Sequence, residues 1–129
     1  MAVSVKFTIP LPPISKKNSQ QIVRRKNGTP FIVPSKKYKE YESKATRFVP
    51  LRLKAIEVPV NVKAVFYMPT HRVVDLVNLQ EALLDVLVKC QFLLDDNSRI
   101  VVSMDGSRVD YDKENPRTEV EITEVCYGD

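Results

Sequence analysis

The chain has 129 residues and a mass of 14.8 kDa, which is the size of one domain. Apolar residues make up 43% and charged residues 28%, a globular composition that excludes a disordered chain. The longest apolar runs fall far short of the ~20 residues of a membrane span, so we expect no membrane segment. Two cysteines are too few for a disulfide framework, and the N-terminus lacks the apolar block of a signal peptide, so we expect a cytoplasmic protein.

The net charge of +4 conceals an asymmetry along the chain. Residues 1–54 contain 13 Lys and Arg against 2 acids, a net charge of +11, whereas residues 55–129 contain 7 Lys and Arg against 14 acids, a net charge of −7. A basic half joined to an acidic half indicates an acidic partner held by one part and divalent-metal chemistry in the other. Chance scatter of charges on a solvated surface is the alternative.

The first half of the chain predicts a strand, a basic hairpin and a helix. Residues 3–9 alternate between apolar and polar side chains, as in a half-buried strand, and Pro10 ends the pattern. Residues 20–33 predict a hairpin that turns at Asn27-Gly28. Ser35 is placed to cap a helix over residues 36–48. Its core-facing side is expected to carry Tyr38, Tyr41, Ala45 and Phe48.

The second half predicts a strand over residues 58–67, a helix over 76–90 with Asp75 placed to cap it, a short strand over 100–104 and a last strand over 118–123. This order favours an α+β fold: one domain over residues 1–129, with a mixed sheet and two helices packed on it.

The helix over 76–90 is expected to have two apolar faces. A broad arc, which should face the sheet, consists of Leu76, Leu79, Leu83, Val86, Leu87 and Cys90. A narrower arc consists of Val77, Leu84 and Val88, and indicates either a homodimer contact or a neighbouring helix or loop.

Acidic residues at both ends of this helix are candidates for chemistry. Asp75 lies at its start, and Asp95-Asp96 follow the apolar run that comes after it. Two acids from separate elements that converge on one spot would suit Mg²⁺, which could activate a water and offset charge on a scissile phosphate. The structural alternative is a helix cap for Asp75 and a turn at Asp95–Asn97.

These residues fall in a recognisable pattern. Asp75-Leu-Val-Asn-Leu-Gln-Glu-Ala-Leu-Leu-Asp-Val-Leu, then Phe92-Leu-Leu-Asp-Asp-Asn-Ser-Arg-Ile-Val, resembles the central block of the RusA family of Holliday-junction resolvases, endodeoxyribonucleases of bacteria and their prophages. Ile9-Pro-Leu-Pro-Pro, Ser15-Lys-Lys-Asn18 and Asn115-Pro-Arg-Thr-Glu-Val-Glu-Ile resemble the flanking parts. The resemblance implies a homodimer, each subunit of which carries a Mg²⁺-dependent acidic site and nicks one strand of a four-way DNA junction during recombination and repair.

The resemblance also implies roles for individual residues. Asp75 and Asp96 match the family's catalytic, metal-binding aspartates, and Asp95, Asn78 and Asp85 match other family positions, with Asp95 as a further metal ligand. Two positions depart from the family pattern: Val77 stands where a second catalytic acid is usual, and Glu81 where a lysine is usual.

Three interpretations of this departure follow. Glu81 supplies the lost catalytic carboxylate; or the enzyme works with fewer protein ligands, which Mg²⁺ tolerates; or the chain is a catalytically weak or inactive branched-DNA binding protein of the same fold. A basic RNA- or protein-binding adaptor is a further alternative of another class.

The basic half contains the expected DNA-binding residues. They are Lys16, Lys17, Asn18, Arg24, Arg25, Lys26 and, three residues before Asp75, Arg72. Lys and Arg contacts to phosphates give salt-dependent affinity with little sequence information. His71 is expected to be an ordinary loop residue rather than a proton carrier.

Overall fold

The computed structural model describes residues 2–16 and 20–127. Its elements are β1 (Ser4–Ile9), β2 (Gln20–Arg24), β3 (Pro30–Pro34), α1 (Lys36–Ala45), the 3₁₀ turn η2 (Thr46–Phe48), β4 (Val60–Met68), α2 (Leu76–Lys89), β5 (Val101–Ser103), β6 (Arg108–Tyr111) and β7 (Arg117–Glu124). None of the helices in these ranges is long and apolar enough to cross a membrane.

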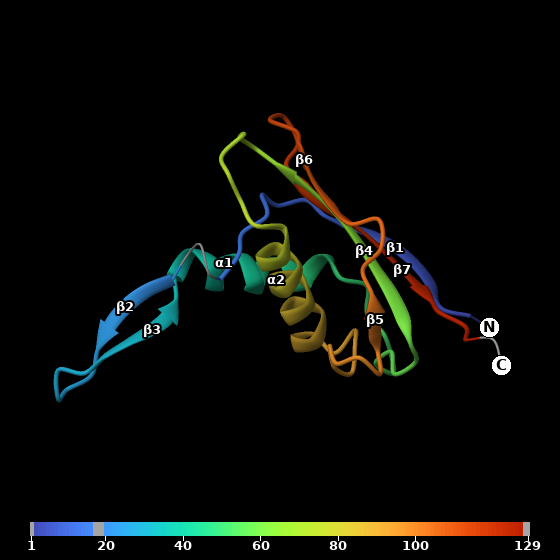
Figure 1. Cartoon of the computed structure of the whole chain (residues 1–129), viewed down its shortest axis with the longest axis horizontal. Coiled ribbons are helices and arrows are strands. Elements are labelled where there is room, and N and C mark those ends of the chain that lie inside the picture. Colours follow the sequence, from blue (N-terminus) through green and yellow to red (C-terminus); the bar gives the residue numbers. More distant parts are fainter. Residues whose placement is uncertain (1, 17–19, 128–129) are drawn as a thin grey trace.

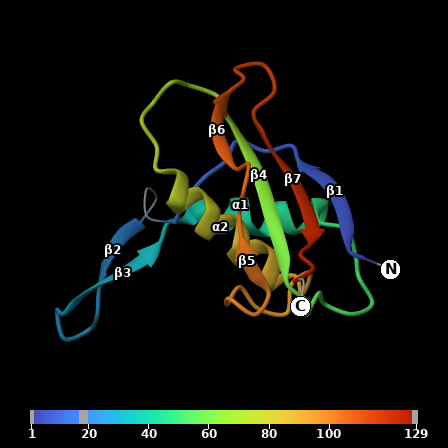
Figure 2. The same cartoon turned by 45° about the vertical axis from the view of Figure 1, so that its right-hand side comes forward.

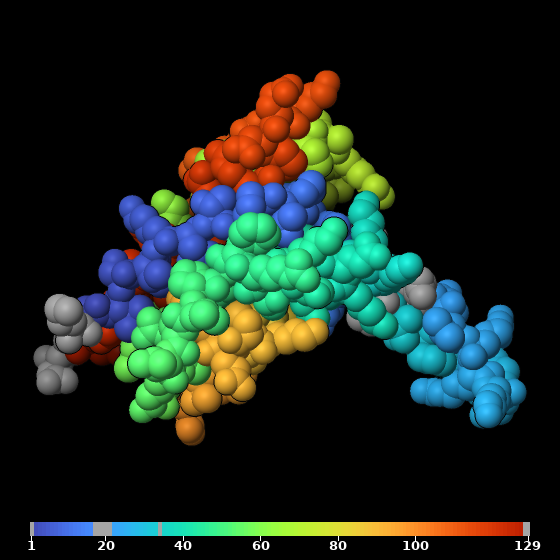
Figure 3. All heavy atoms as spheres, turned by 180° about the vertical axis from the view of Figure 1, so that it is seen from behind, coloured from blue at the N-terminus to red at the C-terminus, as the bar shows by residue number. Residues whose placement is uncertain are grey.

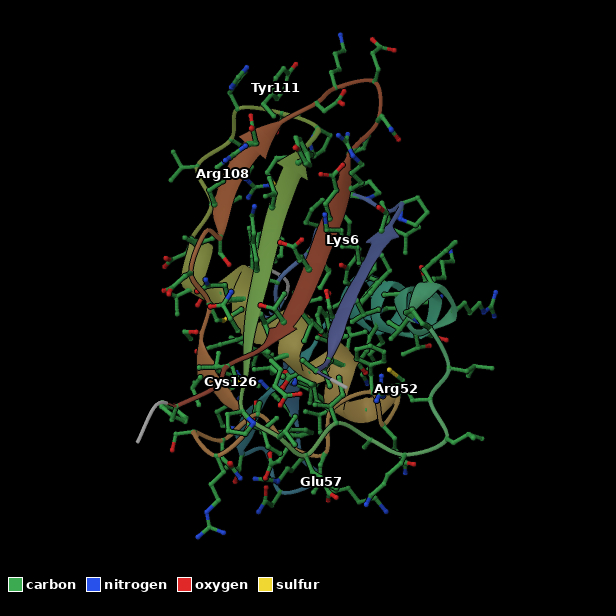
Figure 4. The ribbon with its side chains drawn as sticks, turned by 90° about the vertical axis from the view of Figure 1, so that its right-hand side faces the viewer. Lys6, Arg52, Glu57, Arg108, Tyr111 and Cys126 are labelled. Carbon is green, nitrogen blue, oxygen red and sulfur yellow. The ribbon has the colours of Figure 1, made fainter. Side chains whose placement is uncertain are left out.

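The main sheet is built around β4, the longest strand (Figure 1). β7 pairs antiparallel with one edge of β4, and β1 pairs antiparallel with the outer edge of β7. On the other edge, β5 pairs parallel with the start of β4 and β6 pairs parallel with its end. Both helices lie on one face of this sheet, and Figures 2 and 4 show the other face free of helices. The mixed sheet with two helices packed on it confirms the predicted α+β fold.

The core lies between the sheet and the helices. The alternating residues of β4, Val60, Val62, Ala64 and Phe66, are buried because their side chains point towards the helices. Phe92 and Leu93, which follow α2, are also buried, and the Phe92 ring meets the ring of Phe7 edge-on with centroids 5.5 Å apart. On the opposite face, polar side chains predominate, and Lys6 on β1 pairs with Glu121 on β7 at 3.1 Å (Figure 4).

Helix α1 begins as the sequence predicts. The Ser35 hydroxyl accepts a hydrogen bond from the Tyr38 amide at 3.1 Å, which satisfies one free donor of the first turn. Tyr38 and Tyr41 are buried as expected, but the prediction for Phe48 is wrong, because its side chain is 42% exposed. The α-helix ends at Ala45, and the tighter 3₁₀ turn that follows rotates Phe48 off the buried face.

Helix α2 buries the broad apolar arc, with Leu79, Leu83, Val86 and Leu87 almost fully covered. In the narrower arc, Leu84 and Val88 are half-buried against the edge of the core, whereas Val77 is 57% exposed. The predicted homodimer contact through this arc stays a prediction.

Strands β2 and β3 form a separate two-stranded sheet that projects from the body of the protein (Figures 1 and 3). The turn forms where Asn27-Gly28 predicts it: the Gly28 amide donates to the Arg25 carbonyl oxygen at 2.9 Å, and Gly28 has φ of 88°. Ile22 and Ile32 face each other across the strands and are 72% and 62% exposed. This hairpin, called the arm below (residues 20–34), therefore extends the surface of the protein rather than its hydrophobic core.

Strand β6 was not predicted. Its four residues, Arg-Val-Asp-Tyr, are all exposed, so burial imposes no apolar alternation on them. They are held by pairing with β4, in register from Val65 opposite Arg108 to Met68 opposite Tyr111.

Candidate functional site

Asp75 lies where the loop after β4 enters α2. Its backbone is extended, as at a helix N-cap, but its carboxylate accepts no hydrogen bond from the amides of the first turn, so the predicted side-chain cap is wrong. The Asn78 side-chain amide lies 3.5 Å from Asp75 Oδ2, at the outer limit of a hydrogen bond. The exposed carboxylate therefore makes no capping bond and at most a weak hydrogen bond with Asn78, the residue expected to support it.

The loop that leads to Asp75 is supported by β6. The rings of His71 and Tyr111 stack with centroids 3.8 Å apart and planes 26° apart, and the Asp112 amide donates to the Met68 carbonyl oxygen at 2.9 Å. Figure 4 shows Tyr111 at the far end of β6. No sequence pattern predicts this support, because β6 carries no apolar alternation that would place Tyr111 beside His71.

Asp95 and Asp96 lie at the other end of α2, in the loop before β5. Asp95 is bound to its own turn, since its carboxylate accepts hydrogen bonds from the Asp96 amide at 2.7 Å and from the Asn97 side-chain amide at 3.1 Å. The Asn97 carbonyl oxygen then accepts hydrogen bonds from the amides of Ile100 and Val101. The turn interpretation of Asp95 thus describes its contacts well, and it presents Asp96 at the surface.

Four effects raise the pKa of the Asp96 carboxyl above its usual value. Partial desolvation is the largest, followed by the hydrogen bond and the negative charge of Asp95, with a further contribution from Asp85. A cation bound at this carboxylate would offset the same unfavourable charge.

Lys16 and Asp85 form an ion pair of 2.8 Å. The hydrogen bond to Asp85 raises the pKa of Lys16, whereas burial lowers it. The negative charges of Asp85, Glu42 and Glu81 raise this pKa further. Lys16 was expected to bind DNA and Asp85 to support the acidic site; in the structure each engages the other. The pair joins the segment before the hairpin to α2.

The remaining expected DNA-binding residues fall in two places. Arg24, Arg25 and Lys26 are exposed at the far end of the hairpin arm, where the Arg25 guanidinium lies over the Phe31 ring, 4.7 Å from its centroid. Arg72 is exposed on the loop before α2. Lys17 and Asn18 lie outside the described residues.

Arg72 also lines a cleft of about 800 Å³ between α1, the segment 11–15 and the loop after β4. Lys37 and Lys44 on α1 line the same cleft, and Glu40 is the one acidic residue among the described residues that line it. Three cations against one acid favour an anionic group such as a DNA phosphate. The sequence shows the basic residues of α1, but only the fold places them beside Arg72.

The candidate metal ligands do not converge within one chain. In residues 2–16 and 20–127, no three His, Cys, Asp or Glu side chains are grouped closely enough to hold a metal ion. Asp75 directly precedes α2, whereas the loop between α2 and β5, which contains Asp96, lies at the opposite end of this 14-residue helix (Figure 1). Carboxylate oxygens are suitable ligands for Mg²⁺, but one chain does not bring the expected set together.

Comparison with known proteins agrees with the resemblance seen in the sequence. The family model described as endodeoxyribonuclease RusA matches residues 10–123 of this chain. This match spans the hairpin arm, both helices and strands β2 to β7 except the last residue of β7, whereas β1 lies outside it. No curated protein matches the chain.

Proposed function

Because the chain belongs to the RusA family of endodeoxyribonucleases, we propose that it is a Mg²⁺-dependent endonuclease that resolves four-way DNA junctions by paired symmetric nicks. The observation that carries this proposal is the family match over residues 10–123, which includes both acidic segments and the basic arm. A homodimer suits the substrate, because a two-fold protein presents two equivalent sites to a junction that is itself roughly two-fold.

The basic surfaces support binding to DNA backbones. The arm carries Arg24, Arg25 and Lys26 on a projecting hairpin, and the cleft carries Lys37, Lys44 and Arg72 close to the loop that leads to Asp75. Two separate groups of cations suit a branched substrate, whose arms leave the branch point in different directions. Lys16 belongs to neither group, since it is paired with Asp85.

The acidic residues with proposed catalytic roles are Asp75, Asp96 and Glu81. Asp75 and Asp96 are exposed carboxylates, and Asp75 accepts at most a weak hydrogen bond from Asn78. Glu81 lies in α2, six residues after Asp75, and its charge contributes to the raised pKa of Lys16. In this proposal Glu81 replaces the family acid that Val77 lacks.

Replacement of each acid tests these roles. Glu81→Ala should abolish Mg²⁺-dependent cleavage as severely as Asp75→Asn, whereas Glu57→Ala, which removes an exposed carboxylate paired with Lys54, should leave cleavage unchanged. Wild-type cleavage by the Glu81→Ala protein would show that Glu81 does not replace the lost acid.

Two observations favour a second function, a branched-DNA binding protein without catalysis. Val77 cannot ligate a metal, and in the described part of the chain no three acids gather at one point. A cleavage assay on a synthetic four-way junction, with Mg²⁺ and with EDTA, separates the two functions. The nuclease gives nicked arms only with Mg²⁺, whereas the binding protein shifts the junction on a gel and leaves it intact; linear duplex and single-stranded RNA serve as competitors.

A further inference from the structure

Most of the loop between β4 and α2, residues 69–75, lies outside the hydrophobic core. The residues from Thr70 to Val73 are exposed, and Val73 is 93% exposed, so packing against the core does not fix this stretch. The loop carries Arg72 and ends at Asp75, for which DNA binding and catalysis are proposed. A fixed geometry for these two side chains therefore needs contacts from outside the core.

Tyr111, at the end of β6, provides such a contact. Its ring stacks on the ring of His71, near the middle of the loop, with centroids 3.8 Å apart. Beside this stack, the Asp112 amide donates to the Met68 carbonyl oxygen at 2.9 Å, which ties the start of the loop to the end of β6. Figures 1 and 2 show β6 beside the start of this loop. One short exposed strand thus holds the loop at two points.

Arg117, the first residue of β7, fixes the turn between β6 and β7. Its Nη1 donates to Asp112 Oδ2 and to the Asn115 carbonyl oxygen, both at 2.8 Å. Its Nε donates to Glu119 Oε2 at 2.9 Å, and its guanidinium lies over the Tyr67 ring, 3.9 Å from the centroid. The guanidinium therefore joins β7 and β4 to the turn.

The Asp112 carboxylate connects this guanidinium to the backbone of the turn. Its Oδ1 accepts hydrogen bonds from the amides of Glu114 and Asn115, each at 3.1 Å, while its Oδ2 faces Arg117. The Arg117 side chain is 18% exposed, so solvent screens this ion pair less than a pair on the open surface. Because the amide of the same aspartate bonds Met68, Arg117 is linked to the start of the loop through one residue.

We propose that Arg117, Tyr111 and His71 are positioning residues for the loop 69–75. The inference rests on the proposed function, because this loop carries Arg72 and Asp75. Arg117 fixes the turn that follows Tyr111, and the Tyr111 ring then holds the His71 ring in place. His71 contributes its ring rather than a proton, so another aromatic ring of similar size should serve equally well.

Separate measurements of cleavage and binding test this role. Single-turnover cleavage of a four-way junction at saturating protein gives the rate of the bound complex, and a gel shift without divalent metal gives the affinity. His71→Ala and Tyr111→Ala should slow cleavage about 10- to 100-fold and change the affinity less than about threefold, because misplacement by about 1 Å near a reacting group costs on the order of 100-fold in rate. His71→Phe and Tyr111→Phe, which keep both rings, should retain the wild-type rate and its dependence on pH.

Arg117→Met tests the residue that fixes the turn, with Arg108→Met as the matched control. Arg108 lies on β6 with its side chain 62% exposed and pairs with Asp110 at 3.6 Å, so its replacement removes the same charge without freeing the turn. Arg117→Met should slow cleavage as much as Tyr111→Ala, whereas Arg108→Met should leave it unchanged. If urea unfolding shows that Arg117→Met does not fold, Tyr111→Ala decides, because Tyr111 is 38% exposed and its truncation leaves the core intact.

Backbone nitrogen relaxation, measured by NMR without DNA, gives a readout that does not depend on nuclease activity. The amides of Arg72 and Val73 should have order parameters near about 0.85 in the wild type and in His71→Phe, and below about 0.6 in Tyr111→Ala. Unchanged order parameters in Tyr111→Ala, or loss of cleavage in His71→Phe, would overturn the inference. A wild-type protein that does not nick the junction would instead refute the proposed function, while the order parameters would still test how the loop is held.

Discussion

Removal of the charges at the end of the hairpin arm should weaken junction binding and flatten its dependence on salt. Arg24, Arg25 and Lys26 are exposed, so Arg24→Ala, Arg25→Ala and Lys26→Ala together remove up to three phosphate contacts per arm. Each contact contributes about −0.9 to the slope of log affinity against log salt, so the slope should become less steep by about 2.7. Between 50 and 200 mM salt, the triple variant should therefore lose about 40-fold less affinity than wild type.

The assay is a gel-shift titration of a four-way junction at several salt concentrations without divalent metal, so that cleavage does not interfere. The matched control is the triple variant Lys6→Ala, Lys54→Ala and Lys113→Ala, which removes the same net charge away from the arm and the cleft. The control should keep the wild-type slope. If the arm variant kept the wild-type slope, or if both triples changed it equally, the arm would have no specific part in DNA binding.

Three further predictions concern stability. Because the pKa of Asp96 is raised in the folded protein, the folded state binds a proton at this carboxyl more tightly than the unfolded chain does. The Asp96 carboxyl therefore contributes less to the free energy of unfolding as pH rises above the usual pKa of 3.8. Asp96→Asn should therefore raise the urea midpoint at pH 7, with the difference vanishing below pH 3.8, and an unchanged midpoint at pH 7 would contradict this. Phe92→Ala should cost about 3–5 kcal/mol in urea unfolding, because the side chain is 1% exposed, whereas Leu51→Ala, fully exposed, should cost nothing measurable. Ser35→Ala should cost about 1 kcal/mol through loss of the cap on α1, with Ser43→Ala, exposed within the same helix, as control; equal effects would refute the capping role.

Sequence pattern was sufficient for the elements that burial or local chemistry determines. Apolar residues repeat at the strand period in β4 and at the helical period in α2, because one face of each element is buried. The Asn27-Gly28 pair predicts the turn of the hairpin. Pattern was insufficient for β6, which is exposed and is held by pairing alone, and for Phe48, where a 3₁₀ turn changes the helical period.

The candidate site was predictable as a set of residues but not as an arrangement. The resemblance identifies Asp75 and Asp96 by position, yet spacing along a chain does not give distance in space. Only the fold shows that α2 separates them, that Lys16 is paired with Asp85, and that Arg72 joins two lysines of α1 in one cleft. Contacts of this kind depend on how helices pack on the sheet, and no local pattern encodes them.

Cleavage of a supercoiled plasmid that extrudes a cruciform tests junction resolution most directly. Paired nicks across the four-way junction convert the plasmid to linear molecules in one binding event, so we expect linear product with Mg²⁺ and none with EDTA or with the Asp75→Asn protein. Relaxed nicked circles alone, or intact plasmid at protein concentrations that saturate the junction, would contradict it.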